Sequence, residues 1–520
     1  MAKKLPLGLQ DFREIIEGGY KYIDKTAYVH RLCSSGKYYF LSRPRRFGKS
    51  ITVSVLNELY SGSQELFKGL WIENKWNWSN RHPVIRLALT GIGFQQSGLL
   101  DALDYQLNQL IERHGLKPIE ANLSNKFQYI LRELAQTNKV VVLIDEYDAP
   151  IVHYLGMDLE KAYANREILK EFFSVLKNSD DLLELVFLTG VSKFSKVGVF
   201  SGLNNLTDLT MHPQYATMMG YTQEELEDNF VEEIDSTAQH MSLTREELLV
   251  KMRHWYNGYR FHSEGETVYN PVSVNMFFDQ QEFKNFWFTT GTPTFLINLL
   301  KQEGLYDFKL VPQSEQSFDT FDLEDLNPFG LLYQTGYLTI KEKFTERGRI
   351  KYRLEIPNLE IQFSLNDFFI DVLTTQKSEK LVFQDKLYDV LKAGDLDGLK
   401  SILVALFASI PYQNFTNNKI ADYEGYYASV IYAYFASLGF DITAEDTTSK
   451  GRIDLTLKID SNAYIFEFKV VDKATGDALA QIKSKQYQQK YQESKNSFLI
   501  GIEFGRAERN VVGFEWEKVG

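Results

Sequence analysis

The stretch YYFLSRPRRFGKSITVSVLNELY, residues 38–60, decides how this chain of 520 residues is interpreted. Its first residues, 38–41, form an apolar run that predicts a short buried strand. A basic loop follows, and Gly48-Lys49-Ser50 then opens a segment whose apolar residues recur at helical spacing. A strand, a loop, Gly-Lys-Ser and a helix in this order are typical of a phosphate-binding loop.

The loop residues have distinct physical roles in such a site. Backbone N–H groups at a helix N-terminus bind phosphate oxygens, and Gly48 lets the backbone approach them closely. Lys49 would reach the β- and γ-phosphates, and the Ser50 hydroxyl would ligate Mg²⁺. The usual pattern has glycine where this chain has Arg43, so the loop alone also fits a basic helix cap. The predicted nucleotide-binding residues of this stretch are Arg45, Arg46, Phe47, Gly48, Lys49, Ser50 and Ile51.

A second motif, KVVVLIDEYDAP at residues 139–150, favours nucleotide binding over simple capping. Its apolar run predicts a parallel strand buried on both faces, whose carboxyl end lies where α/β sheets bind ligands. Asp145 would hold Mg²⁺ and Glu146 would polarise the attacking water. Thr189 ends a further predicted strand, residues 185–190, and is either a γ-phosphate sensor or a helix N-cap. Residues 11–32 predict a helical lead-in that either packs near the nucleotide base or covers the sheet edge.

Composition limits the class of protein. The chain is too long for a single core and its 44% apolar and 24% charged residues are ordinary globular values, so three or four domains are expected. The absence of an 18-residue apolar run and of a signal-like start predicts a cytoplasmic protein without membrane contact. The single cysteine, Cys33, excludes an internal disulfide and a cysteine zinc cluster. A net charge of −12 argues against a broadly basic surface, although a metal-dependent nuclease needs only a local basic track.

Four motifs occur in order along the first 215 residues: RPRRFGKS, LIDEYDAP, FLTGVSKF and FSGLNNLTDLT. Together they resemble the bacterial AAA-ATPase-like family, in which arginine commonly replaces the first glycine of the loop. The resemblance implies an ATPase core with an extra strand between the phosphate loop and the acidic strand. It also implies a C-terminal nuclease-like domain. ATP and Mg²⁺ are the expected cofactors.

The middle of the chain carries weaker signals. Residues 221–255 have the spacing of amphipathic helices, which would suit a lid on the nucleotide edge. Aromatic clusters at 256–261 and 286–293 are more typical of core and turn than of base stacking. Short strands are expected at 337–340 and 352–356.

A second chemical site is expected in GRIDLTLKIDSNAYIFEFKV, residues 451–470. Apolar and polar residues alternate along both arms, which predicts a β-hairpin. With Ser461 and Asn462 as the turn, position 454 lies opposite 469 and position 456 opposite 467, so Asp454, Glu467 and Lys469 share one face. Two carboxylates and a lysine can hold Mg²⁺ on a scissile phosphate, through Asp454 and Glu467. The alternative is an exposed hairpin face with a cross-strand ion pair and no function.

The spacing D-(12 residues)-E-X-K resembles the core of the PD-(D/E)XK nucleases, with Asp454, Glu467 and Lys469 in the motif positions. The preceding helix begins with Glu424, where that superfamily often places another acidic residue. A following helix, residues 478–487, supplies basic and amide groups that include Gln481. The proline of the motif is absent because Ile453 precedes Asp454, which leaves catalytic competence open.

The predicted fold is therefore a multidomain α/β protein with a three-layer α/β/α P-loop NTPase core and a restriction-endonuclease-like C-terminal domain. The predicted domains are the ATPase-like 1–215, a helical lid 216–300, a mixed connecting domain 301–380 and a nuclease-like 381–520. The leading hypothesis is an ATPase module that controls a Mg²⁺-dependent nuclease, with DNA favoured over RNA. The alternative is a nucleotide-switched binding scaffold with a non-catalytic nuclease-like domain. A DNA-translocating motor is a weaker third hypothesis, and a homo-oligomer is compatible with all three.

Overall fold

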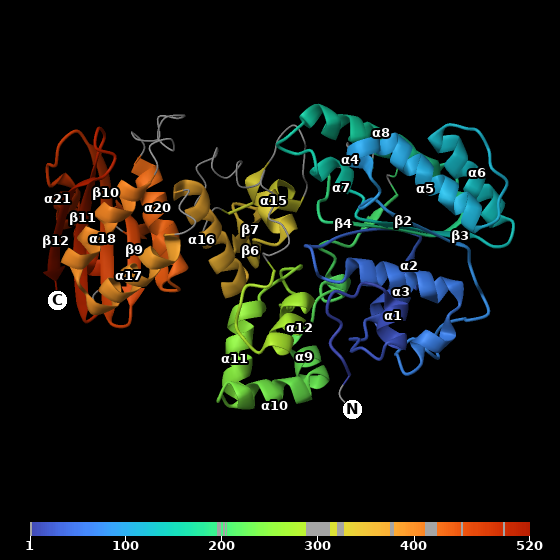
Figure 1. Cartoon of the computed structure of the whole chain (residues 1–520), viewed down its shortest axis with the longest axis horizontal. Helices are drawn as coiled ribbons and strands as arrows, with labels where there is room; N and C mark the ends of the chain where they lie inside the picture. The colour runs from blue at the N-terminus through green and yellow to red at the C-terminus, as the bar shows by residue number, and fades with distance from the viewer. Residues whose placement is uncertain are drawn as a thin grey trace. The chain divides into compact units, whose positions relative to one another are not determined.

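The computed structural model describes residues 3–194, 199–200, 203, 205–287, 312–319, 327–374, 379–410, 424–448, 451–491 and 494–519. Its chain divides into two compact units (Figure 1). In the described chain, unit 1 ends at Asn358 and unit 2 begins at Leu359. No helix in these ranges combines the length and the apolar character that crossing a lipid bilayer requires.

A parallel sheet in the order β2-β3-β4-β1-β5 forms the centre of unit 1. Strands β1, β3 and β4 are almost wholly buried, as continuous apolar runs predict for strands covered on both faces. The order places β4 between β1 and β3, which confirms the predicted extra strand between the phosphate loop and the acidic strand. The strand bounds are β1 Tyr38–Ser42, β2 Val84–Ala88, β3 Val140–Asp145, β4 Leu183–Gly190 and β5 Thr207–Asp208.

Helices lie on both faces of this sheet, which confirms the three-layer α/β core (Figure 1). One face carries α1 to α3, and the other carries the longer α5, α6 and α8. The predicted lead-in is two helices, and the first is capped by Asp11, whose side chain accepts from the Glu14 N–H. The bounds are α1 Phe12–Glu17, α2 Thr26–Ser35, α3 Lys49–Ser61, α4 Phe94–Ser97, α5 Leu99–Arg113, α6 Leu123–Ala135, α7 Ala149–Val152 and α8 Leu159–Lys177.

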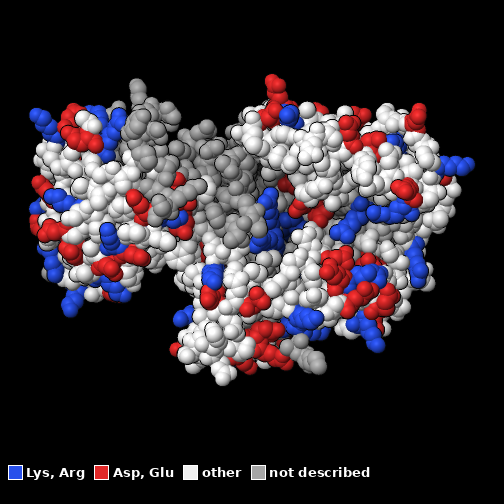
Figure 2. Space-filling view, in the orientation of Figure 1, with Lys and Arg blue, Asp and Glu red and all other residues white. Residues whose placement is uncertain are grey.

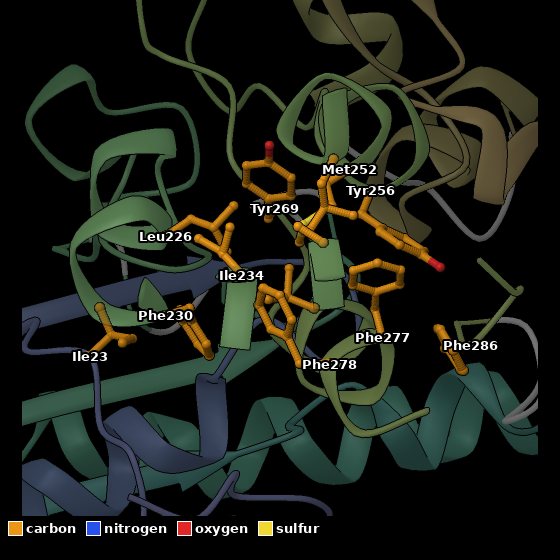
Figure 3. Close-up of a cluster of buried hydrophobic side chains, with 13 residues drawn as sticks. Ile23, Leu226, Phe230, Ile234, Met252, Tyr256, Tyr269, Phe277, Phe278 and Phe286 are labelled. Atoms are coloured by element: carbon orange, nitrogen blue, oxygen red, sulfur yellow. The ribbon is translucent and has the colours of Figure 1, made fainter. Parts of the chain in front are cut away.

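The lid is a helical bundle with its own apolar core (Figure 3). Capping boxes at Thr222 and Thr244 begin two of its helices, and Phe230, Tyr256 and Phe277 pack at its centre. The helical prediction for 221–255 is confirmed, and Ile23 of the lead-in joins this core. The lid helices are α9 Gln223–Asn229, α10 Val231–His240, α11 Arg245–Tyr256 and α12 Pro271–Gln280.

A small connecting element completes unit 1 and includes both predicted strands, as an antiparallel pair. The aromatic stretch predicted at 286–293 is described only as far as residue 287, and the rest lies outside the described residues. The connecting element consists of α14 Glu315–Asp319, α15 Pro328–Thr335, β6 Thr339–Glu346 and β7 Arg349–Glu355.

Unit 2 contains a mixed sheet in the order β12-β11-β10-β9-β8, in which β10 and β11 are parallel and the other pairs antiparallel. Helix α20 begins at Glu424 and is buried along most of its length, as its aromatic sequence predicts. The strands are β8 Asp441–Thr448, β9 Gly451–Ile459, β10 Asn462–Val471, β11 Asn496–Gly505 and β12 Val511–Val519. The helices are α16 Leu359–Thr374, α17 Lys380–Ala393, α18 Leu396–Ser409, α20 Glu424–Ser437 and α21 Asp477–Lys485.

The register of the β9–β10 hairpin differs from the predicted one by two residues. Asn462 is already paired, with Ile459, so the turn residues are Asp460 and Ser461, and Asp460 takes a left-handed backbone (φ 50°). Leu455 consequently pairs with Phe466, and the predicted pairing of 456 with 467 is wrong. A slip of two residues leaves every side chain on the same face, because side chains alternate with period two. The convergence of the polar side chains therefore survives the error.

Candidate functional sites

The phosphate loop, residues 43–50, connects the carboxyl end of β1 to the N-terminus of α3. Gly48 caps the helix in a left-handed conformation (φ 97°), and a Cβ there would meet only open space. The first N–H groups of a helix lack intrahelical acceptors and carry a partial positive charge. The loop is therefore built for an anion at the carboxyl edge of the sheet.

Lys49 is buried inside this loop rather than exposed to solvent. Its ammonium donates hydrogen bonds to the carbonyl oxygens of Arg43 (2.8 Å) and Pro44 (2.9 Å). Burial lowers the pKa of Lys49, and the nearby carboxylates of Glu146 and Asp145 oppose that effect. A phosphate group would replace neutral carbonyl acceptors with charged ones, which bind an ammonium more strongly.

Asp145 and Ser50 come together from β3 and α3. Burial raises the pKa of Asp145, while a hydrogen bond with the Ser50 side chain and the charge of Lys49 lower it. The Oδ1 atom of Asp145 is buried and has no hydrogen-bond partner within the described residues. An unpaired carboxylate oxygen beside a serine hydroxyl fits the protein ligands of a nucleotide-bound Mg²⁺.

Glu146 and Thr189 flank this pair. Glu146 has a left-handed backbone (φ 52°), which turns the chain sharply at the end of β3. The following N–H, of Tyr147, donates to the Thr189 carbonyl at 3.1 Å. Thr189 is fully buried, and its hydroxyl has no partner in the described chain. Unpaired polar atoms and strained backbone at one edge of a sheet are typical of functional sites.

Asp148 has a role that the sequence reasoning missed. It is buried, and its carboxylate accepts hydrogen bonds from the backbone N–H groups of Val191 (3.1 Å) and Ser192 (2.6 Å). Burial raises the pKa of Asp148, and these hydrogen bonds oppose that effect. A Cβ at Gly190 would lie 2.5 Å from the Asp148 Oδ1 atom, so glycine is required there. The sequence signal for this role was the position of Asp148 within LIDEYDAP, three residues after Asp145.

The three arginines of the phosphate loop lie in three different environments. Arg43 is buried and donates to the carbonyls of Thr210 (2.6 Å) and Tyr215 (3.1 Å), with its guanidinium 4.1 Å from the Phe261 ring centre. Burial lowers the pKa of Arg43 to about 10. Arg46 donates to the Phe286 carbonyl at 2.7 Å, whereas Arg45 is exposed. Arg43 is thus a structural strut in the place of the usual glycine.

Phe47 anchors the loop to the segment between α11 and α12. Its ring meets Tyr259 and Phe261 edge to face, with centroid distances of 4.8 and 5.3 Å. Such arrangements stabilise aromatic pairs beyond simple burial. Of the predicted nucleotide-binding residues in this stretch, Gly48, Lys49 and Ser50 therefore face the anion site, whereas the Phe47 ring is committed to packing.

A cavity of about 80 Å³ lies beside the start of α3. The lead-in contributes Tyr22 and Ile23, the segment before the lid contributes Met218 and Met219, and Ile51 completes the wall. Lys21 and Lys25 also line it, but their ammonium groups are held by Glu233 and Glu225 of the lid. The cavity is thus mainly apolar and adjoins the anion site. Sequence reasoning placed the lead-in near a nucleotide base only as one of two alternatives.

The second cluster of charged residues lies in unit 2. Asp454 on β9 accepts a hydrogen bond from the Phe468 N–H at 2.8 Å, which fixes it against β10. Glu424, at the start of α20, lies close enough to this cluster for the charges of Asp454 and Lys469 to affect it. Burial and the charge of Asp454 raise the pKa of Glu424, whereas Lys469 lowers it. The structure thus brings together all four residues that the sequence assigned to this site.

Glu467 is the most perturbed carboxyl of that cluster. Burial and the charges of Asp454 and Glu424 raise its pKa to about 8, against the opposing effects of Lys469 and Gln481. The Gln481 amide on α21 donates to its Oε1 atom, while Oε2 is buried without a partner in the described residues. Acidic groups that crowd together without enough cations are typical of a cation site.

A divalent cation fits this cluster through two carboxylates. Nowhere in the described ranges are three or more His, Cys, Asp or Glu side chains arranged to hold a metal ion. A cation would therefore rest on Asp454 and Glu467, and the unpaired Oε2 atom of Glu467 is the free ligand. Acidic and basic side chains are interspersed over the described residues of the face seen in Figure 2, and this face carries no broad basic surface.

Comparison with known proteins agrees with this geometry. A family model described as a predicted AAA-ATPase matches residues 6–200, the part that contains the phosphate loop and strands β1 to β4 of the parallel sheet. The chain belongs to the AAA-ATPase-like family. In this AAA-ATPase-like protein, a second model, for the PD-(D/E)XK nuclease superfamily, matches residues 422–514.

A relative extends over the whole chain. It is an uncharacterized protein in the vnfD 5' region of Azotobacter chroococcum mcd 1, 41% identical over 526 residues. The alignment covers 100% of this chain and 99% of that protein. The similarity to that protein therefore includes both the ATPase-like and the nuclease-like part of this chain.

Proposed function

We propose that unit 1 binds and hydrolyses ATP at the carboxyl edge of its parallel sheet. The observation that carries this is the convergence of Lys49, Ser50 and Asp145 beside a helix N-terminus. The triphosphate lies on the N–H groups of α3, and Lys49 leaves the carbonyls of its own loop to bind phosphate oxygens. Ser50 and Asp145 hold Mg²⁺, which, when bound, neutralises charge on the β- and γ-phosphates.

The remaining residues of this site act on the water and on the base. Glu146, next to the metal ligand Asp145, orients the attacking water, and the Thr189 hydroxyl contacts the γ-phosphate. The apolar cavity beside Gly48 and Ile51 receives the base, so that the bound nucleotide extends from the sheet edge to the lid.

For unit 2 we propose a metal-dependent nuclease that cleaves phosphodiester bonds, with DNA as the favoured substrate. Asp454 and Glu467 hold a divalent ion, which, when bound, polarises the scissile phosphate. Lys469 stabilises the negative charge that develops there, and Glu424 helps to position the water. ATP binding or turnover in unit 1 controls this activity.

Plasmid cleavage tests the coupled function. Supercoiled DNA, linear DNA and single-stranded RNA are incubated with Mg²⁺ or Mn²⁺, with ATP, a non-hydrolysable analogue or no nucleotide. Cleavage is expected from the wild type, and not from Asp454→Ala. Asp472→Ala is the matched control, since Asp472 is exposed and paired only at the surface with Arg506. Cleavage that persists unchanged in Asp454→Ala would refute the assigned site.

A second candidate function is a nucleotide-switched binding scaffold. It is favoured by Ile453 in place of the motif proline and by the lack of a three-carboxylate metal cage in the described residues. ATP turnover without cleavage of any nucleic acid, and without binding of Mn²⁺ to unit 2, would establish this alternative.

A further inference from the structure

Helix α15 of the connecting element contacts both loops that would surround the γ-phosphate. Its Gln334 side chain accepts a hydrogen bond from the Lys193 backbone N–H at 2.9 Å, in the loop after β4. Gln334 is almost fully buried, so this bond is shielded from water. Lys193 follows Thr189 by four residues, and Asp148 accepts hydrogen bonds from two of the intervening N–H groups, those of Val191 and Ser192.

The other end of the contact is Gly336, which ends α15 and packs against the phosphate loop. Gly336 has a left-handed backbone (φ 92°) and accepts no larger residue, because an added Cβ would lie 2.8 Å from Pro44. Pro44 also supplies one of the two carbonyls that hold the Lys49 ammonium. When Lys49 moves to a phosphate, that hydrogen bond is lost at the residue against which Gly336 packs.

The connecting element also fixes the position of the last residues of unit 1, through contacts with the segment that follows α11. Strand β6 begins at Thr339, three residues after Gly336, and its hydroxyl accepts from the Arg260 N–H at 2.7 Å. At the same end of the β6–β7 pair, just after β7, Asn358 donates to the Asn257 carbonyl at 2.8 Å. A Cβ on Gly258 would lie 1.9 Å from the Pro357 carbonyl, so the backbones are in direct contact.

We propose that α15 and Gly336 form the coupling element that transmits the nucleotide state of the phosphate loop to the start of unit 2. The inference rests on the proposed function, because it requires ATP at this site. Gln334 and Gly336 are positioning residues: they contact the loops, and the loops contact the nucleotide. The phosphate loop and the loop after β4 both contact α15, so a change in one loop is transmitted to the other. The protein then has two arrangements of these loops, and ATP stabilises one of them.

The test measures hydrogen–deuterium exchange of the full chain with and without a non-hydrolysable ATP analogue. The variants are Gln334→Met, which removes the acceptor at similar volume, and Gly336→Ala, which pushes on Pro44. Thr335→Val is the matched control on the same helix, since the Thr335 hydroxyl bonds only to carbonyls of α15. Affinity for the analogue is measured in parallel by fluorescence.

In the wild type and Thr335→Val, the analogue is expected to slow exchange across 328–358 and at the start of α16. In Gln334→Met and Gly336→Ala this change falls about fivefold or more, because the first variant removes the acceptor for the Lys193 N–H and the second displaces Pro44, while affinity stays within about threefold. An unchanged exchange response, or an equal loss of affinity, would overturn the proposal. A wild type that binds no ATP refutes the proposed function as well, and that outcome is visible without any variant.

Discussion

The two candidate sites neutralise their charges in opposite ways. In unit 1, a buried lysine lies among three acidic side chains and is held by backbone carbonyls, so the site has a cation of its own. In unit 2, Asp454, Glu424 and Glu467 share one lysine, and burial together with the charges of the other two carboxyls raises the pKa of Glu467 to about 8. The phosphate loop is thus preorganised without a ligand, whereas the carboxylate cluster is stable in its ionised form only with a cation.

The largest expected effect comes from removing the buried cation of unit 1. Lys49→Met should lower the ATP turnover rate by about 10²–10³-fold, because the developing phosphate charge loses its ammonium partner. Lys37→Met is the control, since Lys37 binds Asp180 at the opposite end of β1. Steady-state ATP hydrolysis checks this, and turnover within threefold of wild type would contradict the assigned role.

Replacement of Arg43 should lower the free energy of unfolding, because Arg43 supports the loop and is not assigned a role in the reaction. Arg43→Met leaves the carbonyls of Thr210 and Tyr215 without their donor, and it should reduce the free energy of unfolding by about 3 kcal/mol. Arg13→Met, which breaks the partly exposed contacts of Arg13 with Glu17, Glu58 and Ser63, should cost only about 1 kcal/mol. Urea unfolding of both variants measures the difference. An equal loss of unfolding free energy in the two variants would exclude the structural role of Arg43.

The unbalanced charge of unit 2 predicts a pH dependence in metal-free protein. The pKa of Glu467 is about 8 when folded, against an ordinary value of 4.5, so the folded state binds the proton more tightly between these values. The free energy of unfolding should therefore fall as the pH rises from about 5 to about 8, by about 3–4 kcal/mol.

Thermal unfolding in EDTA measures this dependence. Glu467→Gln should remove the slope, and Mn²⁺ should restore the stability of the wild type at pH 8 but not that of the variant. Glu515→Gln, at an exposed position on β12, is expected to keep the wild-type slope. A slope that is the same in Glu467→Gln would place the perturbed group elsewhere.

The smallest expected effect concerns the cavity of unit 1, and it distinguishes binding of the nucleotide base from binding of the phosphates. Met219→Trp fills the cavity and should weaken ATP binding about tenfold, or ~1.4 kcal/mol, but leave tripolyphosphate binding unchanged. Met157→Trp, at an exposed methionine, should change neither. Competition against a fluorescent nucleotide measures both ligands. Equal weakening of the two would mean that the cavity does not receive the base.

Local sequence determined the chemistry of both sites because each depends on regular periodicity. The apolar run before Asp145 could only be a buried strand, so the acidic pair had to lie at the carboxyl edge of the sheet. The face shared by Asp454, Glu467 and Lys469 followed from strand alternation alone. This shared face does not depend on which residues form the turn, so the error of two residues in the predicted register did not change it.

Only the tertiary structure decided the contacts between distant segments. The burial of Arg43 depends on carbonyls 167 and 172 residues away, and Gln334 meets a loop 141 residues earlier. The cavity is assembled from the lead-in, α3 and the segment before the lid, none of which carries a motif for a base. Such contacts arise when separate elements pack together, and no periodicity within one segment specifies them. The sequence by itself therefore determined the candidate reacting groups, and the tertiary structure decided what holds them in place.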